Sequence, residues 1–382
     1  MVNELDFRVS ILDSFLISTH REVVEVARLH ADLLERDPLF YGHLAVWAQK
    51  NLDIRDHKEL FVRILLRHHL TKHEDQAVVN ALIDSFAAEA DAANRTQRDA
   101  VAHQIQEAIR SGNEDIAAVI RRLARSGELF VLLPELRDAD AIHLPETADY
   151  NTNFAHLMRI LRYLQVLEDA ARVLPPRDAQ DNRRAMTLEE EAAFLRTYEE
   201  YKAGSGGRME GMDSKLFEEL VDFYRQATVG TFQSGMRAKE QVWLISLLHD
   251  VAKPVLWSQH NHLGGGMYRT LLERFEGYQG EARANDRRVA SDIETHHAMY
   301  YKLEGGEASH RNYQEMLERL SDEADRQRFI RVLAMINISD IRGVGYGGRL
   351  EAEKLKALLA MGRLTPQQVR ERAEAEEAVE DR

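Results

Sequence analysis

A histidine and an aspartate stand side by side, as His249 and Asp250, at the end of the most apolar helix that the sequence predicts. The segment 242–254 reads VWLISLLHDVAKP, so an imidazole and a carboxylate follow directly on a run of large apolar side chains. Polar groups at the end of a buried helix are costly unless something pairs with them, and a divalent cation is one such partner. The pair therefore predicts a metal site.

Further candidate ligands lie downstream, and they are His262, His296, His297 and Asp340. His262 lies in a glycine-rich segment 13 residues after His249, and His260 is a competing choice in the same segment. Neighbouring positions on a helix point about 100° apart, so at most one of His296 and His297 is expected to be a ligand.

The amino-acid composition restricts the chemistry of this site. The chain has 382 residues, 16 histidines and no cysteine. The absence of cysteine excludes disulfides, iron–sulfur clusters, a thiol nucleophile and cysteine-ligated zinc. Histidine and carboxylate ligands remain, and they favour a catalytic divalent metal (Mn, Fe, Zn, Ni or Mg) over structural zinc.

The ordered set LLHDxxK, later histidines and a closing aspartate resembles the HD domain of metal-dependent phosphohydrolases, over residues 215–345. That family has an all-α fold and gathers histidines and a distant aspartate around one or two metals. The ligands that the resemblance implies are His249, Asp250 and Asp340 for one cation, and His262 with His296 or His297 for a second.

Lys253 and Asp250 are the catalytic candidates within this set. Lys253 lies one helical turn after His249, and its ammonium group could reach a phosphate oxygen as a point charge. A metal in such a site lowers the pKa of bound water and neutralises phosphoryl charge. The expected reaction is hydrolysis of a phosphomonoester, a phosphodiester or a cyclic phosphate.

One position departs from the family pattern. Where a first histidine is expected before LLHD, residues 230–235 read GTFQSG, with Gln233 and Ser234 in place of imidazole. Neither side chain is a good transition-metal ligand. His156, in FAHLMR and 93 residues before His249, is the alternative candidate. If no histidine fills this position, a non-catalytic scaffold or sensor that binds RNA or protein is the expected alternative.

The elements that must position these residues are helices, because apolar residues recur at three and four along most of the chain. The run GELFVLLPEL at 127–136 is short enough to be either a buried strand or a helical turn. The predicted helices from residue 150 onward are Asn153–Arg172, Leu188–Tyr201, Lys215–Gln226, Arg237–Leu248, Met267–Phe275, Arg287–Tyr301, Tyr313–Leu320, Ala324–Ile338 and a charged helix from Thr365. The sequence therefore predicts an all-α fold.

Composition shifts divide the chain into four predicted parts. Residues 1–175 are expected to form a HEAT-like helical module, and 176–213 a charged, glycine-rich linker region around GSGG at 204–207. Residues 214–364 would form the HD-type metal-binding domain, and 365–382 a charged C-terminal helix.

The N-terminal part carries a second, fainter resemblance. ERDPLF at 35–40 and HLAVWA at 43–48 are similar to the TROVE module, a HEAT-like ring of RNA-binding ribonucleoproteins. This resemblance implies an RNA partner if a basic surface exists. The candidate basic patch is Arg63, Arg67, His68, His69, Lys72 and His73.

Charge and hydropathy define the remaining expectations. Lys and Arg number 50 against 64 Asp and Glu, a net charge of −14, which argues against a broad nucleic-acid-coating surface but allows a local basic groove. No apolar run approaches the roughly 18 residues of a membrane span, and the acidic start does not fit a signal peptide. We therefore expect a cytoplasmic phosphohydrolase acting on a phosphorylated small molecule, such as a nucleotide, or on RNA, with no membrane partner. The sequence is compatible with a homo-oligomer.

Overall fold

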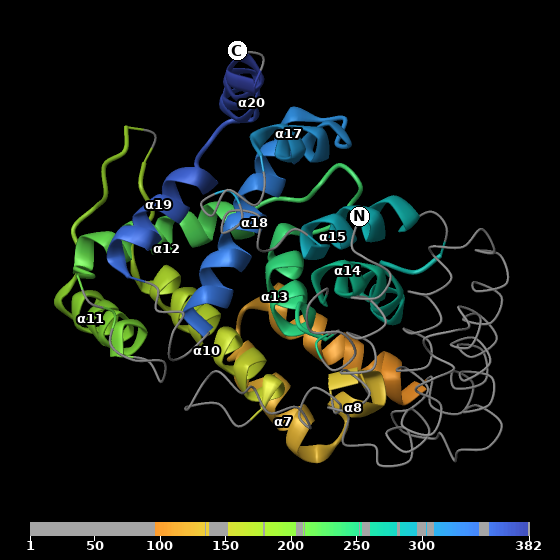
Figure 1. Cartoon of the computed structure of the whole chain (residues 1–382). Helices are drawn as coiled ribbons and strands as arrows, with labels where there is room; N and C mark the ends of the chain where they lie inside the picture. Colours follow the sequence, from red (N-terminus) through yellow and green to blue (C-terminus); the bar gives the residue numbers. More distant parts are fainter. Residues whose placement is uncertain are drawn as a thin grey trace, which may run out of the picture.

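Helices are the main secondary structure of the part of the protein that the structure describes (Figure 1). The computed structural model describes residues 96–133, 135–136, 152–178, 180–203, 209, 211–251, 253, 260–280, 283–295, 303, 309–343 and 351–380. These ranges contain no β-strand, and only two isolated bridges pair Arg177 with Arg183 and Thr231 with Arg237. The predicted all-α class is confirmed.

The described residues form twelve named α-helices and one named 3₁₀ turn. They are α7 (Ile116–Ser126), α8 (Leu129–Leu132), α10 (Asn153–Val173), α11 (Leu188–Ala203), α12 (Ser214–Thr228), α13 (Ala238–Leu248), α14 (His260–Leu271) with the 3₁₀ turn η2 (Leu272–Arg274), α15 (Ala284–Thr295), α17 (His310–Glu318), α18 (Glu323–Gly343), α19 (Ala352–Gly362) and α20 (Pro366–Glu380). Residues 96–111 are also helical. Of the helices so described, none is both long and apolar enough to cross a membrane.

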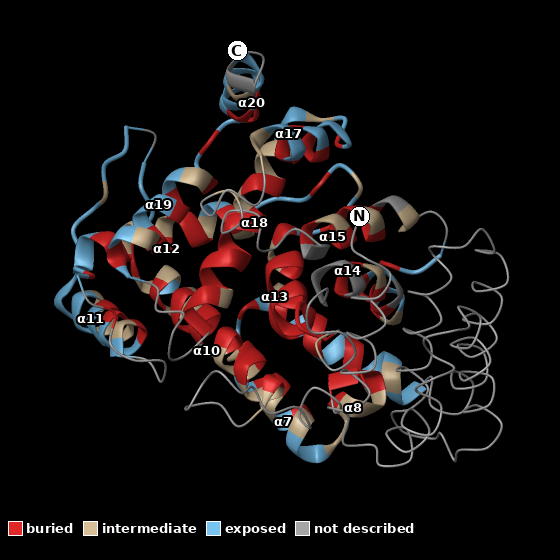
Figure 2. Ribbon diagram, viewed as in Figure 1, coloured by how far each residue is buried: buried red, intermediate tan, exposed pale blue. Residues whose placement is uncertain are grey.

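Four helices, α10, α12, α13 and α18, form the centre of the molecule, and each of them contacts the other three (Figures 1 and 2). In α13 every residue except Lys239 is buried. A helix that is apolar on all sides must be surrounded by others, which is why α13 lies inside the bundle. Outside this centre, α11 packs on α10, α19 packs on α18, and α14 pairs with α15.

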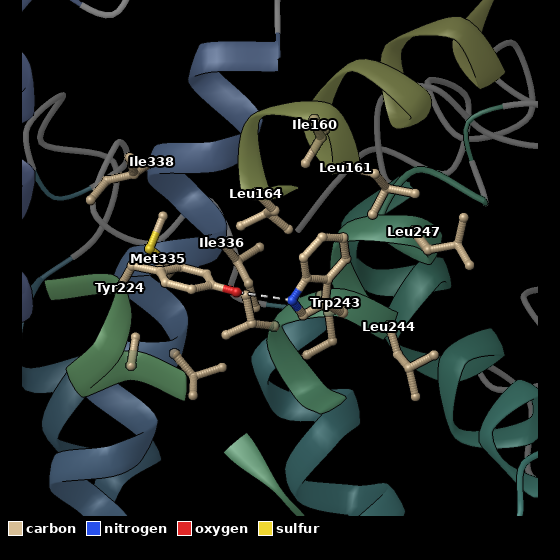
Figure 3. Packing of buried hydrophobic residues seen from close by; sticks show 14 of the residues in the cluster. Ile160, Leu161, Leu164, Tyr224, Trp243, Leu244, Leu247, Met335, Ile336 and Ile338 are labelled. Atoms are coloured by element: carbon tan, nitrogen blue, oxygen red, sulfur yellow. Dashed lines mark hydrogen bonds between the residues drawn. The ribbon is translucent and has the colours of Figure 1, made fainter. Parts of the chain in front are cut away.

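A chain of polar contacts crosses this apolar centre, and Figure 3 shows its link between Trp243 and Tyr224. The indole Nε1 of Trp243 donates to the hydroxyl of Tyr224 over 3.1 Å. That hydroxyl donates to Oε2 of Glu168 over 2.7 Å, and Lys239 Nζ lies 2.8 Å from Oε1 of the same carboxylate. Buried polar groups need such partners, so this chain fixes α10, α12 and α13 relative to one another.

Caps account for two helix starts that the sequence predicts. Thr152 precedes α10, and its Oγ1 accepts from the N–H of Ala155 over 3.1 Å. At α20, Thr365 Oγ1 accepts from the Gln368 N–H, and Gln368 Oε1 accepts from the Thr365 N–H. This reciprocal pair is a capping box, which satisfies donors that a helix start leaves free. The predicted starts at Asn153 and at Thr365-Pro366 are confirmed.

The structure decides between the two readings of the apolar run at 127–136, because Leu129–Leu132 form the short helix α8. One further segment differs from the sequence prediction. Helix α14 begins at His260, although the sequence predicts a glycine-rich turn up to Met267. The glycines are helical because α15 packs closely on them, and Ser291 Oγ donates to the carbonyl of Gly265 over 2.6 Å.

Helix α10 lies among the helices of the predicted second domain, although the sequence analysis assigns it to the first. Helix α11, in the predicted linker region, buries Phe194, Tyr198 and Tyr201 and packs on α10. The boundaries 1–175, 176–213, 214–364 and 365–382 stay predictions. The TROVE-like segments, the basic patch and the glycines at 204–207 lie outside the described residues.

Removing the Tyr224 hydroxyl tests the polar chain. In Tyr224→Phe, Trp243 Nε1 and Glu168 each lose a buried partner, so the free energy of unfolding should fall by about 1–3 kcal/mol. Urea denaturation measures this difference as a lower midpoint at unchanged slope.

Tyr163→Phe is the matched control. Tyr163 is buried, and its hydroxyl has no hydrogen-bond partner among the described residues. Its loss should therefore change stability by less than about 0.5 kcal/mol. Equal losses in the two variants would contradict the role given to the Tyr224 hydroxyl.

Candidate metal centre

The His249–Asp250 pair lies where α13 ends. The N–H of His249 donates to the carbonyl of Ile245 over 2.7 Å, and the chain then turns tightly, with Lys253 N–H donating to the carbonyl of Asp250 over 3.0 Å. Both His249 and Asp250 are 1% exposed. Residues 249–253, the HD turn, thus present an imidazole and a carboxylate inside the protein.

Two other helices bring side chains to the HD turn. Helix α10 contributes His156, which is also 1% exposed and is followed on the same buried face by Ile160. Helix α18 contributes Asp340, whose side chain is 20% exposed. The four side chains together, His156, His249, Asp250 and Asp340, are the His/Asp cluster.

The donor atoms of the His/Asp cluster lie at short and similar distances. His156 Nε2 lies 3.3 Å from Oδ2 of Asp250 and 3.1 Å from Oδ1 of Asp340. His249 Nε2 lies 3.3 Å from the same Asp250 oxygen and 3.2 Å from the same Asp340 oxygen. The two imidazole rings meet edge to face, with centroids 5.5 Å apart.

These distances fit the edges of a metal coordination shell. With ligand bonds of about 2.1 Å, neighbouring donors are separated by about 3.0 Å at right angles and about 3.4 Å in a tetrahedron. The four measured edges, 3.1–3.3 Å, fall between these values. Among the described residues, the ligand atoms of His156, His249 and Asp250 all lie within 4.8 Å of one another. This group could hold a metal ion.

The hydrogen bond on the far side of His249 orients its ring for this role. His249 Nδ1 lies 3.2 Å from the carbonyl oxygen of Ser246. A carbonyl can only accept, so Nδ1 carries a proton, and Nε2 is the ring nitrogen that faces the carboxylates. Histidine ligands of metals commonly have this backbone partner.

The electrostatics of the cluster keep its carboxylates ionised. Burial by itself raises the pKa of Asp250, but the charges of His249 and Lys253 and the hydrogen bond from His156 hold it well below its usual range. Burial likewise opposes ionisation of Asp340, and the two imidazoles lower its pKa well below the usual range.

The pKa of His156 shifts in the opposite direction. Burial lowers its pKa, but the hydrogen bonds and negative charges of Asp250 and Asp340 outweigh burial, so its pKa is raised above its ordinary value. The buried carboxylate of Asp250 and the partly buried carboxylate of Asp340 thus attract positive charge to this point, and a divalent cation supplies it without protons.

Lys253 supplies the nearest ammonium group. Its Nζ lies 2.6 Å from Oδ2 of Asp250, the oxygen that faces both imidazoles, and its side chain is 14% exposed. Lys253 is therefore in contact with the His/Asp cluster and also reaches toward solvent.

The structure brings together four of the predicted site residues: His249, Asp250, Lys253 and Asp340. It adds His156, which the sequence analysis names as the alternative candidate for the first histidine, as the fourth donor. For His262 only the helical backbone in α14 is described, and His296 and His297 lie outside the described residues. A second cation position involving these histidines stays a prediction.

The segment around Ser234, where the sequence analysis expects a first histidine, contacts a different part of α18. The N–H of Gln233 donates to both carboxylate oxygens of Asp325, at 2.9 and 3.1 Å. Asp325 and Asp340 are 15 residues apart on α18, which is about 22 Å of helix. Residues 230–235 therefore pack at the opposite end of α18 from the cluster, and their lack of a histidine leaves the cluster intact.

No protein-family model matches this chain, and no curated protein matches its sequence. The resemblance to the HD domain stays a prediction, and the case for function is built on the geometry of the His/Asp cluster.

Metal content tests the cluster directly. Protein purified without a histidine tag should contain about one equivalent of a divalent transition metal, and His156→Gln and His249→Gln should each lose it, because each removes an imidazole donor. Elemental analysis of the purified proteins gives the ratio.

His103→Gln serves as the control, because the His103 side chain is 63% exposed and its Nδ1 lies 3.6 Å from the exposed carboxylate of Glu276. It should keep the metal of the wild type. A His156→Gln protein that retains a full equivalent would remove His156 from the ligand set.

Gly343, three residues after Asp340, lets α10 approach α18 beside the cluster. A Cβ added there would lie 2.2 Å from Cγ1 of Ile160 and 3.4 Å from Cε1 of His156. Gly343→Ala should therefore displace α10, lowering stability by about 1–3 kcal/mol and weakening metal binding. Calorimetric titration with Zn²⁺ or Mn²⁺ measures the second effect.

Gly362→Ala creates a comparable clash elsewhere. Its Cβ would lie 2.5 Å from Cζ of Phe223 and 2.6 Å from Cβ of Ala334, and it meets no residue of the cluster. We expect a similar loss of stability with unchanged metal affinity. The account of Gly343 fails if the two variants bind metal equally well.

Proposed function

We propose that this protein is a metal-dependent phosphohydrolase with one divalent cation at the His/Asp cluster. The observation that carries the proposal is the set of four mixed nitrogen–oxygen edges of 3.1–3.3 Å between two imidazoles and two carboxylates. A ligand set of histidine and carboxylate suits Mn, Fe, Zn, Ni or Mg.

Three donors that would hold the cation are Nε2 of His156, Nε2 of His249 and a carboxylate oxygen of Asp250. Asp340 Oδ1, which lies 3.1 Å from His156 Nε2 and 3.2 Å from His249 Nε2, is the fourth candidate. When bound, such a cation supplies Lewis acidity toward a phosphate oxygen and toward water. Two carboxylates balance its double charge, so the charge that remains to be neutralised is that of the substrate phosphate.

Access to the cluster is expected from the side of Asp340. Its side chain is 20% exposed, whereas those of His156 and Asp250 are 2% and 1% exposed. Lys253, 14% exposed and bound to Asp250, is suited to donate to a phosphate oxygen at this opening.

The cluster favours a catalytic protein over the alternative of a non-catalytic scaffold or sensor. That alternative depends on a missing first histidine, and His156 offers an imidazole at the required point. We propose a phosphate ester of a nucleotide or of RNA as substrate. The RNA branch depends on the N-terminal basic patch, and the cytoplasmic location and a homo-oligomer remain expectations from the sequence.

Hydrolysis assays test this function. The metal-loaded protein should cleave p-nitrophenyl phosphate, bis(p-nitrophenyl) phosphate or a member of a nucleotide panel, and a chelator should abolish the activity. Asp340→Asn should lower kcat/KM by about 100-fold or more, because it removes a charged donor. Lys253→Met should raise KM more than it lowers kcat, because the lysine contacts the substrate phosphate.

His103→Gln is the control here too and should keep wild-type rates. Wild-type protein that binds its metal but hydrolyses none of these esters would support the sensor alternative and contradict the proposed function.

A further inference from the structure

Asn153 is a fully buried amide at the first turn of α10. Its Nδ2 donates to the backbone carbonyl of Asp250 over 3.0 Å. The two residues are 97 positions apart in the sequence, so this bond joins helix α10 directly to the HD turn.

The carbonyl that Asn153 binds is the centre of the HD turn. The same oxygen accepts from the N–H of Lys253 over 3.0 Å, which closes the turn after Asp250. The turn carries three functional side chains, those of His249, Asp250 and Lys253. Because a turn beyond a helix end has fewer backbone bonds than a helix interior, an added side-chain donor restrains it.

Asn153 and His156 are three residues apart on α10 and so lie on one face of that helix. Both of them contact Asp250, the amide at its main-chain carbonyl and the imidazole at its carboxylate. Helix α10 therefore contacts Asp250 at two points. The hydrogen bond from Asn153 fixes the main chain of Asp250 relative to α10, and this sets the distance between the Asp250 carboxylate and His156.

We propose that Asn153 is a positioning residue of the metal centre, which sets the HD turn at the distance from His156 that a single cation requires. The inference rests on the proposed function, because it needs a metal at the His/Asp cluster. Ligand distances tolerate only about 0.2 Å of error, so a small shift of the turn relative to α10 weakens binding. Loss of an orienting partner typically costs 10–100-fold in metal affinity.

The experiment uses Co²⁺ as the probe with the full-length protein. Asn153→Leu keeps the shape of the side chain and removes its donor, while the Asp250 carbonyl keeps the N–H of Lys253. We expect the Kd for Co²⁺ to rise by about 10–100-fold and the visible d–d bands of bound Co²⁺ to change in energy or intensity. Asn153→Asp is the second variant, to be used if the leucine variant does not fold. Its side chain has the shape of asparagine, but a carboxylate oxygen takes the place of the Nδ2 donor, so the same loss of Co²⁺ affinity is expected.

Gln165→Leu is the matched control on the same helix. Gln165 is also fully buried, and its Oε1 accepts from the backbone N–H of Ile116 over 2.8 Å, which joins α10 to α7 away from the cluster. It should lose stability to a similar degree, with the Kd and the d–d spectrum of the wild type.

The outcomes separate the two claims. If the wild type binds Co²⁺ and Asn153→Leu binds it with the same Kd and the same spectrum, Asn153 has only a structural role and the inference is wrong. If Gln165→Leu weakens binding as much as Asn153→Leu, general destabilisation explains the effect and the inference is also wrong. A wild type that binds no Co²⁺ overturns the metal centre itself.

Discussion

The placement of a buried and a partly buried carboxylate beside two buried imidazoles, at the point where α10, α13 and α18 meet, is the constraint on which the rest of the structure depends. Ionised carboxylates in a protein interior cost several kcal/mol unless positive charge compensates them. Here the compensation comes from His156, His249 and Lys253, with a further place for a cation between the donors. Each of the three helices must therefore deliver its side chain with little error.

The surrounding fold supplies that accuracy. Helix α13 is buried on all sides, so the position where it ends is fixed by its neighbours. The contacts of Tyr224 with Trp243 and Glu168 tie α10, α12 and α13 together inside the bundle. At the cluster, Gly343 permits the close approach of α18 to α10, and the amide of Asn153 holds the HD turn. Packing and polar contacts thus act on the same three elements.

The helices and the His249–Asp250 pair could be predicted from the sequence. The other contacts of the cluster could not, because they join residues that are far apart in the sequence. Periodicity and caps predicted the helices, since both are local properties, and an adjacent His249 and Asp250 after an apolar run indicated a metal site. His156 could only be named as a candidate, because it lies 93 positions before His249 and no local pattern encodes its approach. Asn153 gave no signal, since a buried amide next to a helix start resembles an ordinary capping residue. The glycines of α14 suggested a turn, whereas close packing against α15 keeps them helical.

Anomalous X-ray scattering from crystals of the protein grown with Mn²⁺ or Zn²⁺ tests the central claim most directly. The account predicts one strong anomalous peak between Nε2 of His156, Nε2 of His249 and the carboxylates of Asp250 and Asp340, at about 2.0–2.2 Å from each donor. No peak at this point, in crystals that bind the same metal elsewhere on the chain, would contradict the account.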